Sequence, residues 1–157
     1  MNLSHIDKDG RAVMVDVGHK PISQRTAKAK GRLVVKPETL QLTAEGKTPK
    51  GAVISTAEIA GIMAAKQTHA LIPMCHPLNL TKIKVAISMD VVHSCFHIES
   101  EVGLSGQTGV EMEALMAVSV AGLTLYDMLK AVDKTMRLEG VEVVEKTGGT
   151  KGLDLSL

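Results

Sequence analysis

The chain is organised around one long segment, Thr108–Lys134, which reads TGVEMEALMAVSVAGLTLYDMLKAVDK. The charges of this predicted helix lie at its two ends, and Ala114–Tyr126 carries no charge on any face. An amphipathic surface helix has a polar stripe, so a helix that is apolar all round is expected to be buried. A small domain seldom encloses a whole helix. We therefore expect this helix to pack against other copies of the chain, with its charged ends at sites between subunits.

Length and composition indicate one cytoplasmic domain. The chain has 157 residues, of which 45% are apolar and 22% are charged, as in ordinary globular proteins. No apolar run reaches membrane-spanning length, the first residues lack the layout of a signal peptide, and two cysteines make no disulfide framework. We expect a reduced protein with an aliphatic core, because Phe96 and Tyr126 are the only aromatic residues.

The other segments alternate between strands and helices. We expect an extended arm over residues 1–26 and a flexible tail over residues 147–157. The predicted strands are 27–35, 81–89, 94–102 and 136–146, and the predicted shorter helices are 37–46 and 55–67. Ser55 with Glu58, and Thr108 with Glu111, have capping-box spacing. This order predicts a single α+β domain over residues 1–157, ferredoxin-like (split βαβ), with helices packed on one face of an antiparallel sheet.

One segment, Gly18–Pro37, is basic and contains no acid, although the net charge of the chain is only +1 and predicts no polyanion partner. On a strand, Lys28, Lys30 and Arg32 would point to one side. That side is either a solvated surface or an anion site. The chain has no glycine-rich phosphate loop, so side chains or the tail would have to hold a phosphate. The tail residues suited to this, unless the tail is simply frayed, are Lys146, Gly148, Gly149, Lys151 and Gly152.

Asp127 and Lys130 are three residues apart on the long helix and share a face. A solvated salt bridge is the ordinary interpretation of such a pair. However, an acid near a helix C-terminus opposes the helix dipole, and the preceding turns are apolar. We therefore also consider a partly desolvated pair that exchanges protons near neutral pH.

Polar residues at two further places are candidate ligand contacts. Glu111 is interpreted as a capping carboxylate, and Glu113 lies about 200° further around the helix, so that both cannot face one ligand. Pro73 and Pro77 hold the segment between them extended. Adjacent residues there point in opposite directions, which argues against a Cys75–His76 couple and leaves His76 as a ligand contact or an acid/base.

Metal signals in the sequence are weak. His69, Cys75 and His76 match no familiar zinc spacing. His93 and His97 have the spacing of helical metal ligands, but they lie at the start of a predicted strand, where that spacing means little. We expect no metal site.

Five motifs follow one another in the order found in a known family. They are MVDV at Met14–Val17, AGIMAAK at Ala60–Lys66, IPMCHPL at Ile72–Leu78, GQTGVEMEAL at Gly106–Leu115 and YDMLKAVDK at Tyr126–Lys134. On these motifs the chain, from about His5 to Gly149, resembles the cyclic pyranopterin monophosphate synthase family (MoaC), which serves molybdenum cofactor biosynthesis.

The resemblance implies a lyase that acts by general acid/base catalysis. It would convert (8S)-3′,8-cyclo-7,8-dihydroguanosine 5′-triphosphate, a cyclic GTP derivative, to cyclic pyranopterin monophosphate with release of pyrophosphate. It also implies a homohexamer, a trimer of dimers, that binds neither nucleic acid nor membrane. No cofactor is expected to be required, although Mg²⁺ can accompany a triphosphate.

The resemblance also implies site residues by position. The catalytic positions match Asp127, Lys130 and Lys50. The substrate-binding positions match Met74, Cys75, His76, Met112, Glu113 and Glu111, with Arg25, Lys66 and Lys146 as the basic residues. Glu113 and Asp127 are fourteen residues apart, roughly 21 Å along a helix, so we expect each site to be assembled from two subunits.

Two other functions remain as alternatives. One is a non-catalytic oligomeric regulatory domain, which would bind a nucleotide without releasing pyrophosphate. The other is an RNA-binding module, which is poorly supported because the predicted central strands offer only Phe96 for stacking on bases.

Overall fold

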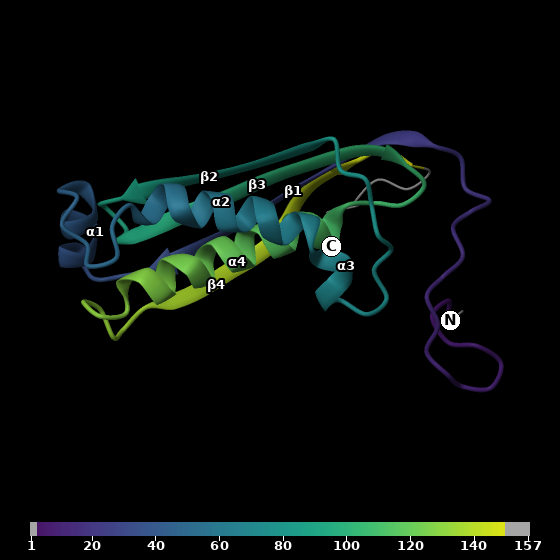
Figure 1. Ribbon diagram of the computed structural model, residues 1–157, viewed down its shortest axis with the longest axis horizontal. Helices are drawn as coiled ribbons and strands as arrows, with labels where there is room; N and C mark the ends of the chain where they lie inside the picture. Colours follow the sequence, from purple (N-terminus) through teal and green to yellow (C-terminus); the bar gives the residue numbers. More distant parts are fainter. Residues whose placement is uncertain (1–2, 150–157) are drawn as a thin grey trace.

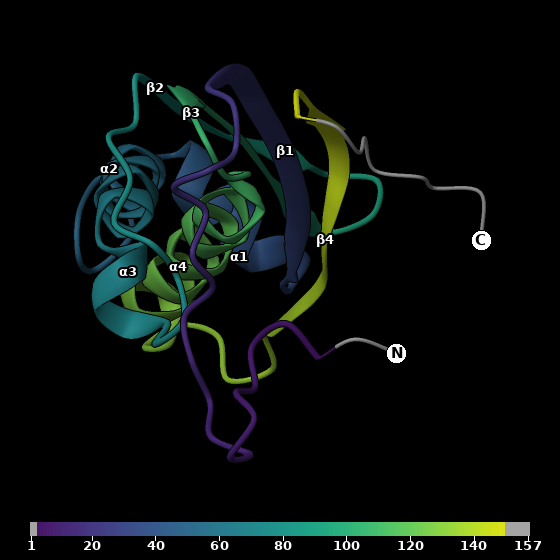
Figure 2. The same cartoon turned by 90° about the vertical axis from the view of Figure 1, so that its right-hand side faces the viewer.

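The computed structural model describes residues 3–149 (Figure 1). Its elements are β1 (Ser23–Val34), α1 (Pro37–Ala44), α2 (Val53–Lys66), α3 (Thr68–Leu71), β2 (Lys82–Asp90), β3 (Cys95–Gly106), α4 (Glu111–Leu129) and β4 (Arg137–Thr147). The strands form one antiparallel sheet in the order β2-β3-β1-β4. Helices α2 and α4 cover one face of this sheet, as Figure 2 shows from the end. The predicted α+β class is confirmed.

The sheet separates an apolar face from a charged one because side chains alternate along each strand. On β1, Ala27, Ala29 and Leu33 are buried under the helices. Lys28, Lys30 and Arg32 point to the opposite face, as predicted from their spacing. Each of the three forms an ion pair with a glutamate of β4. These partners make the basic side an exposed ladder of ion pairs rather than an anion site.

Helix α4 packs on β1, β3 and β4 and lies beside α2 on the same face of the sheet (Figure 1). By length and composition it is apolar enough to cross a membrane, but half of its apolar window is buried inside the domain. It is not enclosed on all sides, because Leu123 is 58% exposed. One chain does not bury the whole helix, and the prediction that other copies of the chain cover the rest stays a prediction.

Both capping-box predictions are wrong. Helix α2 begins at Val53 and α4 at Glu111, and neither has a side-chain cap. The carboxylates that were expected to cap have tertiary partners instead. Glu58 accepts a hydrogen bond from the backbone N–H of Ile87 on β2, at 3.0 Å, and Glu111 pairs with Lys146 of β4.

The chain before β1 forms the arm. Strand β1 begins at Ser23, four residues before the predicted start, so the arm is shorter than expected. Within it, Ile6 pairs with Ala12 in an isolated β-bridge. The arm then runs past the end of the domain where α4 begins (Figure 2). At the other terminus, Lys151 and Gly152 of the predicted tail lie outside the described residues.

The segment after α4 is anchored by Asp133, which is 1% exposed. Its carboxylate accepts hydrogen bonds from the backbone N–H of Lys36 and from the hydroxyl of Thr39, both at 2.9 Å, and from Thr135 at 2.8 Å. Burial by itself raises the pKa of Asp133, but these donors outweigh it and lower the pKa to about 2. In the sequence, Asp133 is only one of the charged residues at the end of the long helix, and nothing there indicates its burial.

Candidate active site

The sequence-predicted site residues form two groups at opposite ends of α4. The first, which we call the acid–amine cluster, consists of Lys50, Asp127 and Lys130. The second, which we call the helix-start pocket, is a cavity of about 260 Å³ over the first turn of α4. The predicted residues that line this pocket are Met74, Cys75, His76, Glu111, Met112 and Glu113.

In the acid–amine cluster, one carboxylate lies between two ammonium groups. The Nζ of Lys130 is 2.9 Å from Oδ1 of Asp127, one turn back on the same helix. The Nζ of Lys50 is 3.1 Å from Oδ2 of Asp127 and donates to its backbone carbonyl at 3.3 Å. Lys50 comes from the loop before α2, where Gly51 has φ +85° and its carbonyl accepts from the Thr48 hydroxyl at 2.6 Å. This turn, 77 residues away in sequence, brings the second amine to the acid.

The acid–amine cluster is exposed to solvent in one chain. The side chains of Asp127 and Lys130 are 57% and 53% exposed. Hydrogen bonds from Lys130 and then Lys50 lower the pKa of Asp127, and Asp127 raises the pKa of Lys130. Within one chain the pair is an exposed salt bridge, and its mutual hydrogen bonds favour the charged form of both groups. The hypothesis of a partly desolvated pair between copies of the chain stays a prediction.

Three segments build the helix-start pocket: the arm, the loop after α3 and the first turn of α4. The Nε2 atom of His76 lies 2.5 Å from the carbonyl oxygen of Val15, which fastens the arm to the loop. The side-chain amide of Gln107 donates to the carbonyls of Gly18 and Lys20, both at 3.0 Å. These contacts hold the arm over the pocket.

Two acids of α4 line the same pocket. Glu113 is 4% exposed, and burial raises its pKa. Glu111 is only partly exposed and pairs with Lys146. Both residues line one cavity, because it lies over the helix start. That they cannot both face one ligand stays a prediction.

The thiol of Cys75 also lines the pocket. Burial, followed by the charges of Glu113 and Glu111, raises its pKa. A thiol that keeps its proton is a weak nucleophile. This environment agrees with the sequence argument against a Cys75–His76 couple.

The basic candidates lie at different places. Arg25 is 9% exposed, and its Nε donates to the carbonyl of Gly106 at 3.0 Å, near the pocket. Lys146 reaches the pocket through Glu111. Lys66 is exposed in the last turn of α2 and is not among the described residues that line the pocket.

Sequence analysis missed the contribution of the arm. His5, Val15, Val17 and Lys20 line the pocket together with the predicted residues. The MVDV motif, which includes Val15 and Val17, was the available signal. Its contact with a loop some sixty residues later was not visible in the sequence.

The two other sequence hypotheses can also be compared with the structure. Phe96 is fully buried, so it is unavailable for stacking on RNA bases. His69, Cys75 and His76 do not come together as metal ligands. Within residues 3–149, the ligand atoms that converge belong to Asp90, Cys95 and His97.

Comparison with known proteins agrees with the family resemblance found in the sequence motifs. The sequence model of the MoaC family matches residues 14–149. A cyclic pyranopterin monophosphate synthase of Methylobacterium sp. is 54% identical over 151 residues, which cover 96% of this chain and 94% of the relative. A protein of the same name from Chloroflexus aggregans is 55% identical over 150 residues, with 96% and 91% covered. One from Thermomicrobium roseum is 53% identical over 150 residues, with 96% and 90% covered.

Proposed function

The chain belongs to the MoaC family, and we propose that it works at a site that joins the acid–amine cluster of one copy to the helix-start pocket of another. It is a lyase of molybdenum cofactor biosynthesis that acts on a small GTP-derived molecule. It converts (8S)-3′,8-cyclo-7,8-dihydroguanosine 5′-triphosphate to cyclic pyranopterin monophosphate and pyrophosphate. The observation that carries the proposal is the placement of Asp127 between two amines.

The reaction needs a base, an acid and positive charge. Ring rearrangement moves several protons, and closure of the cyclic phosphate releases a pyrophosphate anion. We assign the proton transfers to Asp127 and Lys130, and the role of acid or charge stabiliser to Lys50. Their pKa directions support opposite ionisation states at neutral pH, with Asp127 as the base and Lys130 as the acid. Substrate and a second copy would exclude water and bring the two proton affinities closer.

The helix-start pocket suits the purine-derived rings of the substrate. Met74 and Met112 offer apolar, adaptable surface. Burial raises the pKa of the Cys75 thiol and of the Glu113 carboxyl, so this part of the pocket disfavours their charged forms. His76, held by Val15, offers a ring nitrogen at a defined position. Together these groups give the mixed apolar and polar lining that is typical of small-molecule sites.

The triphosphate is assigned to the basic residues Arg25 and Lys146, with Lys66 as an outer contact. Lys146 already binds one carboxylate, that of Glu111, so a phosphate oxygen can take the place of that partner. Lys20 of the arm lines the pocket and adds a further positive charge. We propose that Mg²⁺ enters only with the triphosphate and that the protein needs no resident cofactor for this reaction.

A shared site explains how residues at both ends of α4 serve one substrate. Glu113 and Asp127 are separated by roughly 21 Å along the helix, too far for one reacting centre. Ile59, Met63 and Leu123 expose about 60% of their surface on α2 and α4, which supports coverage of these helices by another copy. We propose that the assembly is a cytoplasmic homohexamer built as a trimer of dimers, and the family resemblance supports this proposal.

A coupled pyrophosphate assay on the cyclic triphosphate tests the assignment. Asp127→Asn and Lys130→Ala should each lower kcat by at least about 100-fold, because each removes a proton-transfer group. The matched control is Lys47→Ala, which removes an exposed lysine three residues from Lys50. It should keep the wild-type rate. Near wild-type turnover in both site variants would refute these roles.

The same assay separates the enzyme from the regulatory alternative. A non-catalytic domain would bind the triphosphate tightly and release no pyrophosphate. The shared name of the relatives supports the enzyme and not this alternative.

A further inference from the structure

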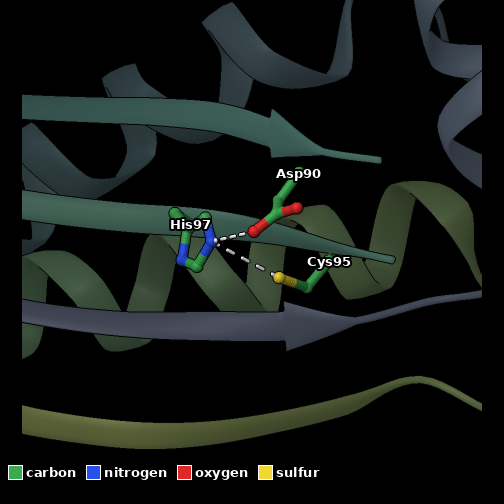
Figure 3. A group of neighbouring side chains, drawn as sticks. All are labelled: Asp90, Cys95 and His97. Atoms are coloured by element: carbon green, nitrogen blue, oxygen red, sulfur yellow. Dashed lines mark hydrogen bonds and ion pairs between the residues drawn. The ribbon is translucent and has the colours of Figure 1, made fainter. Parts of the chain in front are cut away.

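The turn between β2 and β3 carries four potential metal ligands within eight residues, Asp90, His93, Cys95 and His97. Figure 3 shows three of them, Asp90, Cys95 and His97. Asp90 ends β2 and pairs in register with Cys95, the first residue of β3. His97 lies two residues further along β3, so its side chain points to the same face as that of Cys95. The intervening Phe96 is buried under the helices, which places the ligands on the opposite, open face of the sheet.

The donor atoms of Asp90, Cys95 and His97 all lie within 4.8 Å of one another, and His93 adjoins this group through Asp90. The Nε2 atom of His97 is 2.7 Å from Oδ2 of Asp90 and 3.7 Å from Sγ of Cys95. The Nδ1 atom of His93 is 2.9 Å from the same Oδ2. A ring nitrogen carries either one proton or one lone pair, so Nε2 of His97 cannot satisfy a carboxylate and a thiol together. A cation at the centre of these atoms would satisfy all of them.

The spacing also fits a tetrahedral site. Zn–N and Zn–S bonds of about 2.05 and 2.3 Å place the nitrogen and sulfur ligands about 3.6 Å apart. The separation between His97 and Cys95 is 3.7 Å. The Asp90 oxygen has to move away from both imidazole nitrogens, from 2.7 Å for His97 and 2.9 Å for His93 to about 3.3 Å, once the hydrogen bonds give way to metal bonds.

The turn is held in place without an ion. Ser94 adopts φ 51° at the tightest point, its hydroxyl donates to the carbonyl of Val35 at 2.7 Å, and its own carbonyl accepts from the Val35 N–H at 3.0 Å. Cys95 is 1% exposed, whereas the side chain of His93 is 76% exposed. The ligand set therefore combines a fixed, buried sulfur with an open side through which an ion can enter.

Charge balance favours a divalent ion. A thiolate and a carboxylate supply two negative charges. The nearest cation is Arg32, which pairs with His97 in the strand register, and its charge is taken by Glu139 at 2.9 Å. Nitrogen and sulfur ligands favour Zn²⁺ over Mg²⁺ and Ca²⁺, which prefer oxygen.

We propose that Asp90, Cys95 and His97, with His93 as the fourth ligand, form a zinc site at the β2–β3 turn. Each imidazole gives a nitrogen lone pair to the ion, and the thiol of Cys95 loses its proton to solvent, with no change in oxidation state. The site shares no residue with the acid–amine cluster or the helix-start pocket, so it is separate from the proposed catalytic function. Bound zinc joins the end of β2 to the start of β3 and stabilises the hairpin.

Titration of the chelator-treated full-length protein with Co²⁺ and Zn²⁺ tests the proposal. Co²⁺ should bind with the visible bands of a tetrahedral complex and a near-ultraviolet thiolate charge-transfer band, and Zn²⁺ should abolish both. Calorimetry of Zn²⁺ binding in two buffers of different ionisation enthalpy should reveal release of the thiol proton. Absence of the thiolate band or of saturable Zn²⁺ binding would overturn the site.

Variants locate the ion. Cys95→Ser and His97→Gln should each weaken Zn²⁺ binding by at least about 100-fold, because loss of a ligand exceeds the effect of losing an outer-shell partner. The matched controls, Cys75→Ser and His69→Gln, remove the other cysteine and another exposed histidine and should leave Zn²⁺ affinity unchanged. His97→Gln should also leave pyrophosphate release unchanged. If Cys95→Ser does not fold, His97→Gln and Asp90→Asn decide the matter, and Zn²⁺ affinity unchanged in both would overturn the proposal.

Discussion

Two aspartates near the end of α4, six residues apart, have opposite environments. The side chain of Asp127 is 57% exposed and lies between two lysine amines, whereas Asp133 is 1% exposed and accepts only from neutral N–H and hydroxyl donors. In the sequence both are charges that follow an apolar run. Their different roles depend on Lys50 and Thr39, which come from remote segments and which no local pattern connects to the helix.

The pH dependence of stability should reveal Asp133. Its folded pKa of about 2 is below its ordinary value of 3.8, so the unfolded chain takes up the proton first as the pH falls. The stabilisation is therefore complete above about pH 5 and is lost as the pH falls toward 2. Its size is roughly 2 kcal/mol, from about two pKa units.

Urea unfolding of the wild type and of Asp133→Asn between pH 7 and pH 2 measures this contribution. The variant should be less stable at pH 7 and should lack this part of the acid loss. Asp9→Asn, in the exposed arm, is the control and should keep the wild-type profile. Superimposable wild-type and Asp133→Asn profiles would contradict the role given to these hydrogen bonds.

At the scale of the element, glycines allow close packing of the helices. Gly61 lies where α2 contacts α4, and Gly122 lies where α4 contacts β4. A Cβ on Gly61 would lie 2.7 Å from the carbonyl oxygen of Ala117, and one on Gly122 would lie 2.5 Å from the side chain of Leu138. The first contact is with backbone, which cannot rotate away. The apolar spacing of residues 55–67 and the uncharged run 114–126 predicted the two helices, but neither pattern indicated a role for these glycines.

Gly61→Ala should therefore destabilise the protein, by about 1–3 kcal/mol, although alanine is the better helix former by about 1 kcal/mol. The steric cost exceeds the gain in propensity because α4 must move. Ser55→Ala, an exposed position on the same helix, should be neutral or slightly stabilising. Denaturant unfolding compares the two, and equal or higher stability of Gly61→Ala would show that the helices separate without cost.

At the scale of the whole molecule, the proposed machinery is divided between the two ends of one helix. The fold brings Lys50 to Asp127 at one end and the arm to the loop around His76 at the other. No movement within a single rigid helix can join these groups. The proposed function therefore requires a second copy, with its helix placed alongside, to supply the other half of the site.

Mixing of two inactive variants tests this arrangement. Glu113→Gln disables the helix-start pocket, and Asp127→Asn disables the acid–amine cluster. After subunit exchange, a mixed assembly contains some sites with both halves intact, so pyrophosphate release should return to about a quarter of the wild-type rate in a random two-subunit mixture. Each variant alone, taken through the same exchange, is the control. No recovery after exchange verified by mass would exclude shared sites.

The sequence by itself determined the order of strands and helices apart from the four-residue α3, together with the α+β class and the family. These follow from local periodicity and from contiguous motifs, which need no knowledge of remote contacts. It also predicted that Lys28, Lys30 and Arg32 share one side of β1. It did not predict their glutamate partners, because the register between β1 and β4 joins residues more than a hundred positions apart.

Only the tertiary structure decided the environment of each candidate residue. Glu58 and Glu111 do not cap helices, because each has a partner on a strand. Glu58 accepts from the Ile87 N–H of β2, and Glu111 pairs with Lys146 of β4. The β2–β3 register places Asp90 opposite Cys95 and brings both close to His97. Because these residues belong to two strands, their spacing along the sequence did not indicate the cluster. Burial, ionisation and ligand geometry depend on what surrounds a side chain, and most of those neighbours are distant in sequence.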